Sequence, residues 1–235
     1  MKRHTRIAVT AIVTGVLICI IPYVATYSQV GPNMWGTRSV TSHGTIRYPT
    51  DNFNSAILNG FWTFEDPQGN SSVDLGARAG WLRIATTSPP LRDMISGPRI
   101  IQSNITGDFT ISTRVQLSSN NVAGSAGIIV RKDSKNTVIL HRTLSTNMKE
   151  QIFFGIKDGS NTTYDLPLHI LDPVTLFLDK RGNAFEGSYI DANNEWHDVG
   201  TLILPLDASL DAGLSATATQ EGTFVGFFDF VHLFS

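Results

Sequence analysis

The sequence predicts an all-β fold, a two-sheet antiparallel jelly-roll sandwich, preceded by one N-terminal transmembrane or signal helix. From residue 51 onward, short segments with β-favouring patterns alternate with turn residues, and amphipathic helical periodicity is absent. Only the N-terminus carries a long uncharged apolar run. About thirteen short strands in one domain are typical of a sandwich or jelly roll.

The first element, residues 1–27, is a membrane-targeting segment. Lys2, Arg3 and Arg6 precede 21 uncharged residues at positions 7–27, which as a helix would span about 30 Å, the thickness of a bilayer core. The basic flank places the N-terminus inside and the following chain outside. The length favours a signal anchor, and a cleaved signal peptide is the alternative. The domain is therefore expected outside the cytoplasm, membrane-anchored, or secreted if the segment is cleaved.

Residues 28–50 are expected to form a linker, because Gly and Pro recur there among Ser and Thr. Residues 51–235 form the predicted domain. Its expected strands are 61–65, 72–75, 81–86, 99–102, 109–117, 126–132, 137–142, 151–157, 174–180, 184–190, 196–204, 212–219 and 224–234.

The segment 109–117 shows the clearest alternation. Its odd positions, from Phe109 to Leu117, are apolar or Thr, whereas the even positions, which include Arg114, are polar. One face of this strand should pack on a core and the other should be wet.

Charge and cysteine content exclude some functions. After the targeting segment, 15 basic and 20 acidic side chains remain, so the domain lacks the basic balance of a nucleic-acid binder. The only cysteine, Cys19, lies in the apolar run. No intrachain disulfide and no cysteine-based zinc site can form.

Several motifs, in the same order, resemble the concanavalin A-like lectin/glucanase superfamily. More narrowly, they resemble the jelly-roll accessory domains of bacterial β-xylosidases and laminin-G-like domains. The motifs are Asp-Asn-Phe at 51–53, Phe-Trp-Thr-Phe at 61–64, Gly-Trp-Leu-Arg-Ile at 80–84, Gly-Asp-Phe-Thr at 107–110, Ala-Gly-Leu at 212–214 and Phe-Asp-Phe at 228–230. The resemblance covers residues 51–234 and implies the fold more than the ligand.

No catalytic motif is found, so an enzyme is not expected. Glycosidases use two carboxylates that flank the scissile bond. The laminarinase-like enzymes of the superfamily place them as Glu-x-Asp-x-x-Glu, and none of the five glutamates here has that spacing. The six histidines have no metal-ligand spacing, and no Ser/His/Asp motif is present.

The predicted function is a non-catalytic, surface-displayed carbohydrate-binding module whose partner is a glycan or polysaccharide. Planar aromatic side chains beside polar groups are suited to sugars. Trp62 and Trp81 are interpreted as packing residues. The candidate ligand-binding residues are Arg114, Arg131, His141, Tyr189 and Trp196. The alternative is a structural or protein-interaction module of the cell envelope, with an envelope protein as partner; a glycoside hydrolase is less favoured.

The resemblance also implies a structural calcium ion near the two ends of the domain. Asp51 and Asp229 are the corresponding candidates, since carboxylates and backbone carbonyls suit calcium. Alternatively, Asp51 caps a turn and Asp229 hydrogen-bonds within an edge strand.

Overall fold

The computed structural model describes residues 48, 50–87, 94–118, 122–156, 161–165, 172–206 and 209–235, with only the backbone for 162–165. These residues belong to the compact unit His43–Ser235; a second unit comprises Met1–Ser42. The predicted targeting segment and nearly all of the predicted linker lie outside the described residues. Within the described ranges there is no helix, and so none that could cross a bilayer.

The described part of the chain contains fourteen β-strands. They are β1 (Thr63–Glu65), β2 (Ser71–Arg78), β3 (Trp81–Thr87), β4 (Arg99–Ile105), β5 (Phe109–Leu117), β6 (Gly124–Arg131), β7 (Thr137–Leu144), β8 (Glu150–Ile156), β9 (Asn161–Asp165), β10 (Val174–Arg181), β11 (Ala184–Ile190), β12 (Trp196–Ile203), β13 (Leu210–Ala218) and β14 (Thr223–Phe234). All thirteen predicted strands are present, and β9 is the strand that the sequence pattern did not reveal.

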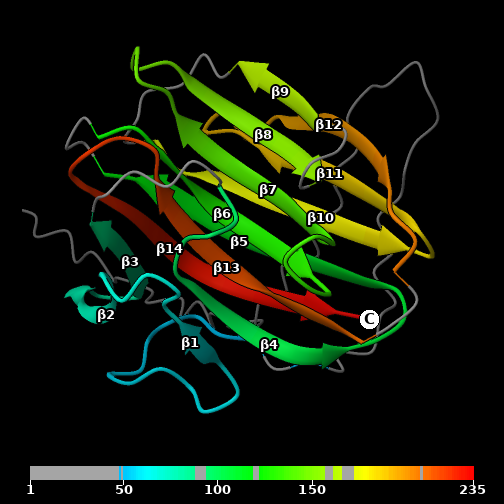
Figure 1. Ribbon diagram of the computed structural model, residues 1–235, viewed down its shortest axis with the longest axis horizontal. Helices are drawn as coiled ribbons and strands as arrows, with labels where there is room; N and C mark the ends of the chain where they lie inside the picture. The colour runs from blue at the N-terminus through cyan, green and yellow to red at the C-terminus, as the bar shows by residue number, and fades with distance from the viewer. Residues whose placement is uncertain are drawn as a thin grey trace, which may run out of the picture. The chain divides into compact units, whose positions relative to one another are not determined.

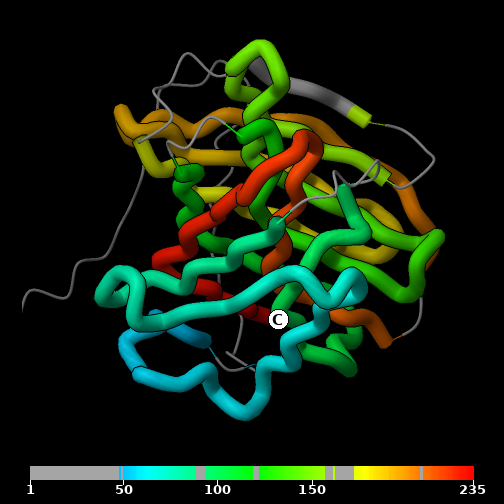
Figure 2. The backbone as a smooth tube through the Cα atoms, turned by 60° about the vertical axis from the view of Figure 1, so that its left-hand side comes forward, coloured from blue at the N-terminus to red at the C-terminus, as the bar shows by residue number. Residues whose placement is uncertain are grey.

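The strands form two seven-stranded antiparallel sheets that lie one over the other (Figure 1). The β6 sheet, named for its central strand, has the order β1-β4-β13-β6-β7-β8-β9, and the β5 sheet has the order β12-β11-β10-β5-β14-β3-β2. Strands from the end of the sequence lie between strands from its first half: β14 separates β5 from β3, and β13 separates β6 from β4. Figure 2 shows this interleaving as red segments beside green and teal ones. The predicted all-β class with two antiparallel sheets is confirmed.

The core lies between the two sheets and follows the alternation of the strands. On β5, Phe109, Ile111, Val115 and Leu117 are fully buried, whereas Arg114 is exposed on the other face. Trp62 belongs to this core. Trp81 is also buried, but on the opposite face of β3 from Leu82 and Ile84, with the Arg78 guanidinium 3.9 Å from the centroid of its ring. The inward face assigned to residues 109–117 from the sequence is therefore correct, whereas the outward face is only partly wet, because Ser112 on it is buried.

The first residue of the domain joins the last strand. Asp51 forms an isolated antiparallel bridge with Val231, through two backbone hydrogen bonds of 3.0 and 2.8 Å. The motif at 51–53 and the closing strand, far apart in the sequence, thus lie side by side.

Much of the outer face of the β6 sheet is covered. Ile101, Ile129 and Ile139 form a second small hydrophobic cluster there, and Met94 and Ile95 pack on it. The Thr217 hydroxyl donates a hydrogen bond of 2.9 Å to the carbonyl of Met94, which fixes this covering segment to β13. The middle of this face is therefore not an open groove.

Candidate functional site

The predicted ligand-binding residues do not form one patch. Arg114 lies on β5, whereas Arg131 and His141 lie on β6 and β7. Although β5 and β6 are consecutive in the sequence, they belong to different sheets. Of these three predicted residues, Arg131 and His141 lie on the paired strands β6 and β7, whereas Arg114 lies on the other sheet and cannot share a patch with them.

His141 is a buried structural residue. Its Nδ1 lies 3.0 Å from Ser125 Oγ on β6, and its Nε2 lies 2.9 Å from Ser215 Oγ on β13. The ring passes over Gly127, where a Cβ would stand 2.9 Å from the His141 Cδ2 atom. Full burial lowers the pKa of His141 to about 3, so the imidazole is neutral near pH 7. The ring links three strands and does not reach a surface ligand.

Tyr189 also belongs to the interior. It is 1% exposed, and its ring stacks on His197 with 4.6 Å between centroids. Tyr189 pairs with His197 across the β11–β12 hairpin, whereas Trp196 pairs with Ile190. Because neighbouring residues of a strand point to opposite faces, Tyr189 and Trp196 lie on opposite faces of the β5 sheet, and of the two only Trp196 is exposed.

Trp196 is presented at the surface in a fixed orientation. It is 45% exposed on the outer face of the β5 sheet. Its indole Nε1–H donates a hydrogen bond of 3.0 Å to Asp198 Oδ1, and its ring packs against Phe177 with 4.8 Å between centroids. Because Phe177 and Asp198 fix the indole in this orientation, it offers a preformed surface on which a sugar ring can stack.

The register places Trp196 in line with Arg114. Trp196 pairs with Ile190, Ile190 with Thr175, and Thr175 with Arg114, so these four residues form a row across β12, β11, β10 and β5. We call them the Trp196 row. Adjacent strands are about 4.8 Å apart, so the row extends roughly 14 Å from a planar ring to a guanidinium group.

The far end of the Trp196 row is polar and solvated. The Arg114 side chain is 45% exposed and lies 3.5 Å from Asp229 Oδ2, a long contact that leaves most of its donors available. Two residues that the sequence analysis did not select, Phe177 and Asp198, support the row. Alternation along 174–180 could have placed Phe177 on this face, but its partner across the sheet depends on the register.

The two predicted calcium ligands do not fit a calcium ion. Asp51 is 6% exposed, and its carboxylate accepts hydrogen bonds from the Phe53 amide (2.8 Å), the Asn59 side chain (2.8 Å) and the Trp62 indole (3.1 Å). These N–H groups direct positive charge at both oxygens, where a cation would have to bind. Asp229 faces Arg114 instead. Asp51 thus fixes the turn that follows it, as the alternative interpretation has it.

A cluster of Asp191, Glu195 and His197 brings three potential ligand atoms within 4.8 Å of one another. Its geometry is explained by the turn between β11 and β12. Asp191 Oδ1 accepts the amides of Asn193 and Glu195, both at 2.9 Å, and Oδ2 accepts from His197 at 3.2 Å. Burial raises the pKa of Asp191, but these hydrogen bonds outweigh it and lower the pKa on balance.

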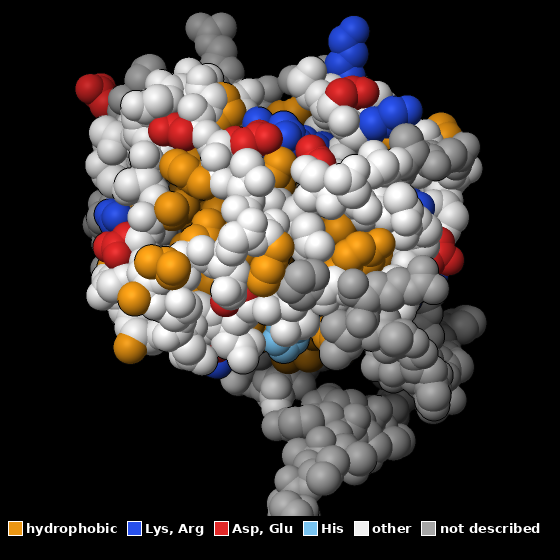
Figure 3. All heavy atoms as spheres, turned by 90° about the horizontal axis from the view of Figure 1, so that it is seen from below, with side chains coloured by type: hydrophobic (Ala, Val, Ile, Leu, Met, Phe, Trp, Pro, Cys, Tyr) orange, Lys and Arg blue, Asp and Glu red, His pale blue; other side chains and the backbone are white. Residues whose placement is uncertain are grey.

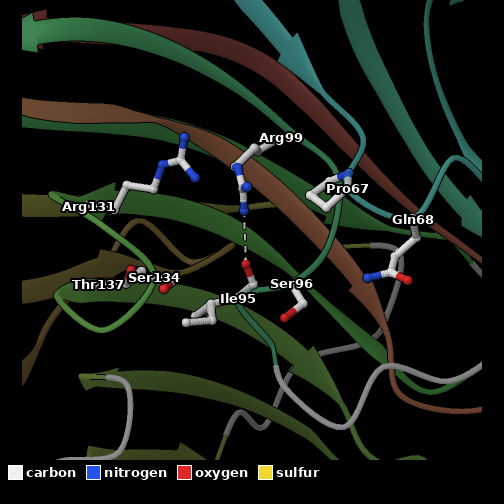
Figure 4. A pocket seen from close by; sticks show the side chains of 8 residues that line it. All are labelled: Pro67, Gln68, Ile95, Ser96, Arg99, Arg131, Ser134 and Thr137. Atoms are coloured by element: carbon white, nitrogen blue, oxygen red, sulfur yellow. Dashed lines mark hydrogen bonds between the residues drawn. The ribbon is translucent and has the colours of Figure 1, made fainter.

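The remaining predicted residue, Arg131, lines a pocket of about 210 Å³ on the outer face of the β6 sheet (Figure 4). Arg131 Nη2 donates to both oxygens of Glu65 at 2.8 Å, and Arg131 Nε donates to Asp211 at 3.2 Å. Arg99 Nε donates to the same Glu65 at 2.7 Å. Two guanidinium groups from β4 and β6 thus converge on one carboxylate from β1.

This geometry can be compared with known proteins. Residues 50–231 match the family described as the beta-xylosidase C-terminal concanavalin A-like domain. The chain belongs to this family. The resemblance inferred from the motifs is confirmed, and the matched domain is the non-catalytic C-terminal accessory module of GH43 enzymes. No curated protein sequence matches the chain.

Solved structures share the fold at low sequence identity. The GH43 BlXynB protein from Bacillus licheniformis, as the K247S mutant, has a TM-score of 0.62 at 16% identity, over 79% of this chain and 39% of the other. The Bacteroides ovatus xyloglucan PUL GH43B gives 0.61 at 20%, over 83% and 41%. Peanut lectin gives 0.56 at 13%, over 79% and 96%. The chain thus spans less than half of the GH43 proteins and nearly a whole lectin.

Proposed function

We propose that this protein is a non-catalytic carbohydrate-binding module, displayed outside the cytoplasm by its N-terminal segment, and that it binds polysaccharide on the outer face of the β5 sheet. The observation that carries the proposal is the Trp196 row. An exposed indole at one end and an exposed guanidinium at the other provide a stacking surface and charged donors on one face.

The names of similar structures support a choice of ligands to test. Two of the similar structures are a xylan beta-1,4-xylosidase from Bacillus halodurans and a GH43 protein of a xyloglucan PUL from Bacteroides ovatus. β-Linked neutral polysaccharides of this kind are therefore the first ligands to test. The extended row suits an extended chain, because sugar rings can stack on Trp196 while hydroxyl groups further along reach Arg114.

The experiment compares binding of xylo-oligosaccharides and xyloglucan fragments by isothermal titration calorimetry. Arg114→Ala removes hydrogen bonds to a charged group, worth about 1.5–3 kcal/mol each, so affinity should fall about tenfold or more. Trp196→Ala should weaken binding similarly through loss of the stacking surface. The melting midpoint of Arg114→Ala should stay close to that of the parent, because the Arg114 side chain is 45% exposed. Trp196→Ala also loses the packing on Phe177, so its midpoint should fall somewhat while the fold is kept.

Ile203→Ala is the matched control. Ile203 is a 66% exposed hydrophobic residue on the same strand as Trp196, outside the Trp196 row. Its replacement should leave the affinity unchanged. If Arg114→Ala and Trp196→Ala both bind a screened glycan as the parent does, the proposed site is wrong.

A protein-interaction module of the cell envelope is the second candidate. Exposed Ile57 and Ile203 favour it, since apolar side chains at a surface suit a protein partner. In the view of Figure 3, however, hydrophobic side chains lie in separate groups between polar ones, without one broad apolar patch. Absence of binding to every glycan tested would make this second function the better proposal.

A further inference from the structure

The pocket of Figure 4 lies on the opposite sheet from the Trp196 row, and the proposed function does not use it. Its lining residues are Pro67, Gln68, Ile95, Ser96, Arg99, Arg131, Ser134 and Thr137. Two of these side chains are guanidinium groups, and none is a carboxylate. We propose that this pocket binds the carboxylate of an acidic sugar, a hexuronate unit of a glycan. This inference rests on the proposed glycan-binding function and adds a second site to it.

The two arginines are held in place by two carboxylates outside the pocket lining and by the carbonyl of one lining residue, Ile95. The side chains of Arg99 and Arg131 are 11% and 18% exposed, and Glu65 and Asp211 bind them. Arg99 Nη1 donates to the Ile95 carbonyl at 3.0 Å, the interaction drawn in Figure 4. Such fixation lowers the entropy lost when a ligand is bound.

Each guanidinium keeps one nitrogen for a ligand. Arg99 uses Nε and Nη1, and Arg131 uses Nε and Nη2. Arg99 Nη2 and Arg131 Nη1 make no hydrogen bond within the described part of the chain. The nearby carboxylates of Glu65 and Asp211 already accept hydrogen bonds from these arginines. The guanidinium groups that the pocket offers to a ligand are hydrogen-bond donors. A carboxylate is the acceptor that forms the strongest hydrogen bonds with them.

The other lining residues fit the rest of a sugar. Gln68 and Ser134 are exposed at the rim and offer an amide and a hydroxyl, while Pro67 and Ile95 provide apolar contact. The volume of about 210 Å³ is below the roughly 300–1,000 Å³ of pockets for drug-sized ligands. The pocket therefore suits one sugar unit rather than a chain. The negative charges of Glu65 and Asp211 balance the positive charges of the two arginines. Selectivity for a carboxylate must therefore come from the direction of the hydrogen-bond donors, and the affinity should be modest.

The test uses the full chain and free monosaccharides, observed by saturation-transfer NMR and quantified by calorimetry. Glucuronate should bind about tenfold or more tightly than glucose, because charge-assisted hydrogen bonds are about twice as strong as neutral ones. Binding should weaken as salt is raised. Equal binding of glucuronate and glucose would overturn the proposal. Acetate binding as tightly as glucuronate would also overturn it, since the pocket would then recognise a carboxylate without its sugar.

Two isosteric variants, expected to change the affinity in opposite directions, test whether glucuronate binds in this pocket. Gln68→Glu adds a negative charge at the exposed rim and should weaken glucuronate binding, whereas Asp211→Asn removes one beside Arg131 and should strengthen it. A unit charge about 6 Å from the ligand in water changes affinity by roughly threefold. Both changes leave the Arg99–Glu65 pair intact, so folding should be preserved. Glucuronate binding that both variants leave unchanged would place the anion elsewhere and refute the pocket.

Trp196→Ala separates this inference from the proposed function. If neutral oligosaccharides bind at the Trp196 row, this variant should lose them and still bind glucuronate. Glucuronate binding that is lost together with neutral binding would refute a separate acidic site. A parent protein that binds glucuronate but no neutral glycan would instead refute the Trp196 row and support the pocket.

Discussion

The buried imidazole of His141 should make the protein lose stability between pH 6.5 and pH 5. In the folded state, burial lowers the pKa of His141 from 6.5 to about 3. In the unfolded chain the same ring has an ordinary pKa near 6.5. Below this pH the unfolded state therefore binds one more proton than the folded state, and the free energy of unfolding falls as the pH is lowered.

The magnitude follows from the width of the pH window. Each pH unit below the unfolded pKa and above the folded pKa costs about 1.4 kcal/mol for one proton. Lowering the pH from 6.5 to 5 should thus remove up to about 2 kcal/mol. Most carboxylates remain ionised at pH 5, because their ordinary pKa values are near 4. The loss should continue toward pH 3 and then level off for this residue.

Urea unfolding at a series of pH values measures this slope, and His141→Gln should reduce it by about one proton equivalent. An NMR titration gives a second reading that does not need the variant to fold. In the folded parent, the ring resonances of His141 should not titrate between pH 7 and pH 4.5. A folded-state pKa above 5, or an equal slope in His141→Gln, would refute the reasoning.

Three further predictions concern the interior. Arg142 is fully buried on β7 and donates to Glu150 through Nε (3.1 Å) and Nη2. Glu150→Gln should destabilise the fold by about 3–5 kcal/mol, because it removes the carboxylate to which a buried charge donates two hydrogen bonds; a loss below 1 kcal/mol in urea unfolding would contradict this. Gly213→Ala should prevent native folding, as seen by circular dichroism, because its Cβ would lie 1.9 Å from the Ile100 carbonyl oxygen; a native spectrum would show that the strands can separate. A chelator should leave the melting midpoint unchanged, since N–H donors already occupy Asp51, and a fall of several degrees would restore a structural cation.

The sequence predicted which face of a strand is buried better than it predicted which strands lie next to one another in a sheet. Alternation along 109–117 placed Arg114 outside and Val115 inside, as the structure has them. Alternation does not reveal which sheet a strand joins. Because the chain crosses between the sheets after β5, Arg114 and Arg131 lie on different faces of the sandwich. Hydrophobic burial is a local signal, whereas sheet order depends on contacts between distant segments.

Pairing across a hairpin was the second element that the sequence left open. Tyr189 and Trp196 flank the same turn, but the register of β11 and β12 directs one inward and the other outward. A register displaced by one residue would reverse both assignments. His141 was misassigned for a different reason: two serines and a glycine on neighbouring strands make room for a neutral imidazole, and those partners are distant in the sequence.

The bridge between Asp51 and Val231 means that the chain enters and leaves the sandwich at neighbouring points. Domains whose ends lie close together can be inserted into a loop of a host protein or circularly permuted without disturbing their core. Residues 50–235 should therefore tolerate transplantation as a cassette joined by short linkers at both ends. New ends opened in the exposed turn at 192–194 would leave the bridge intact.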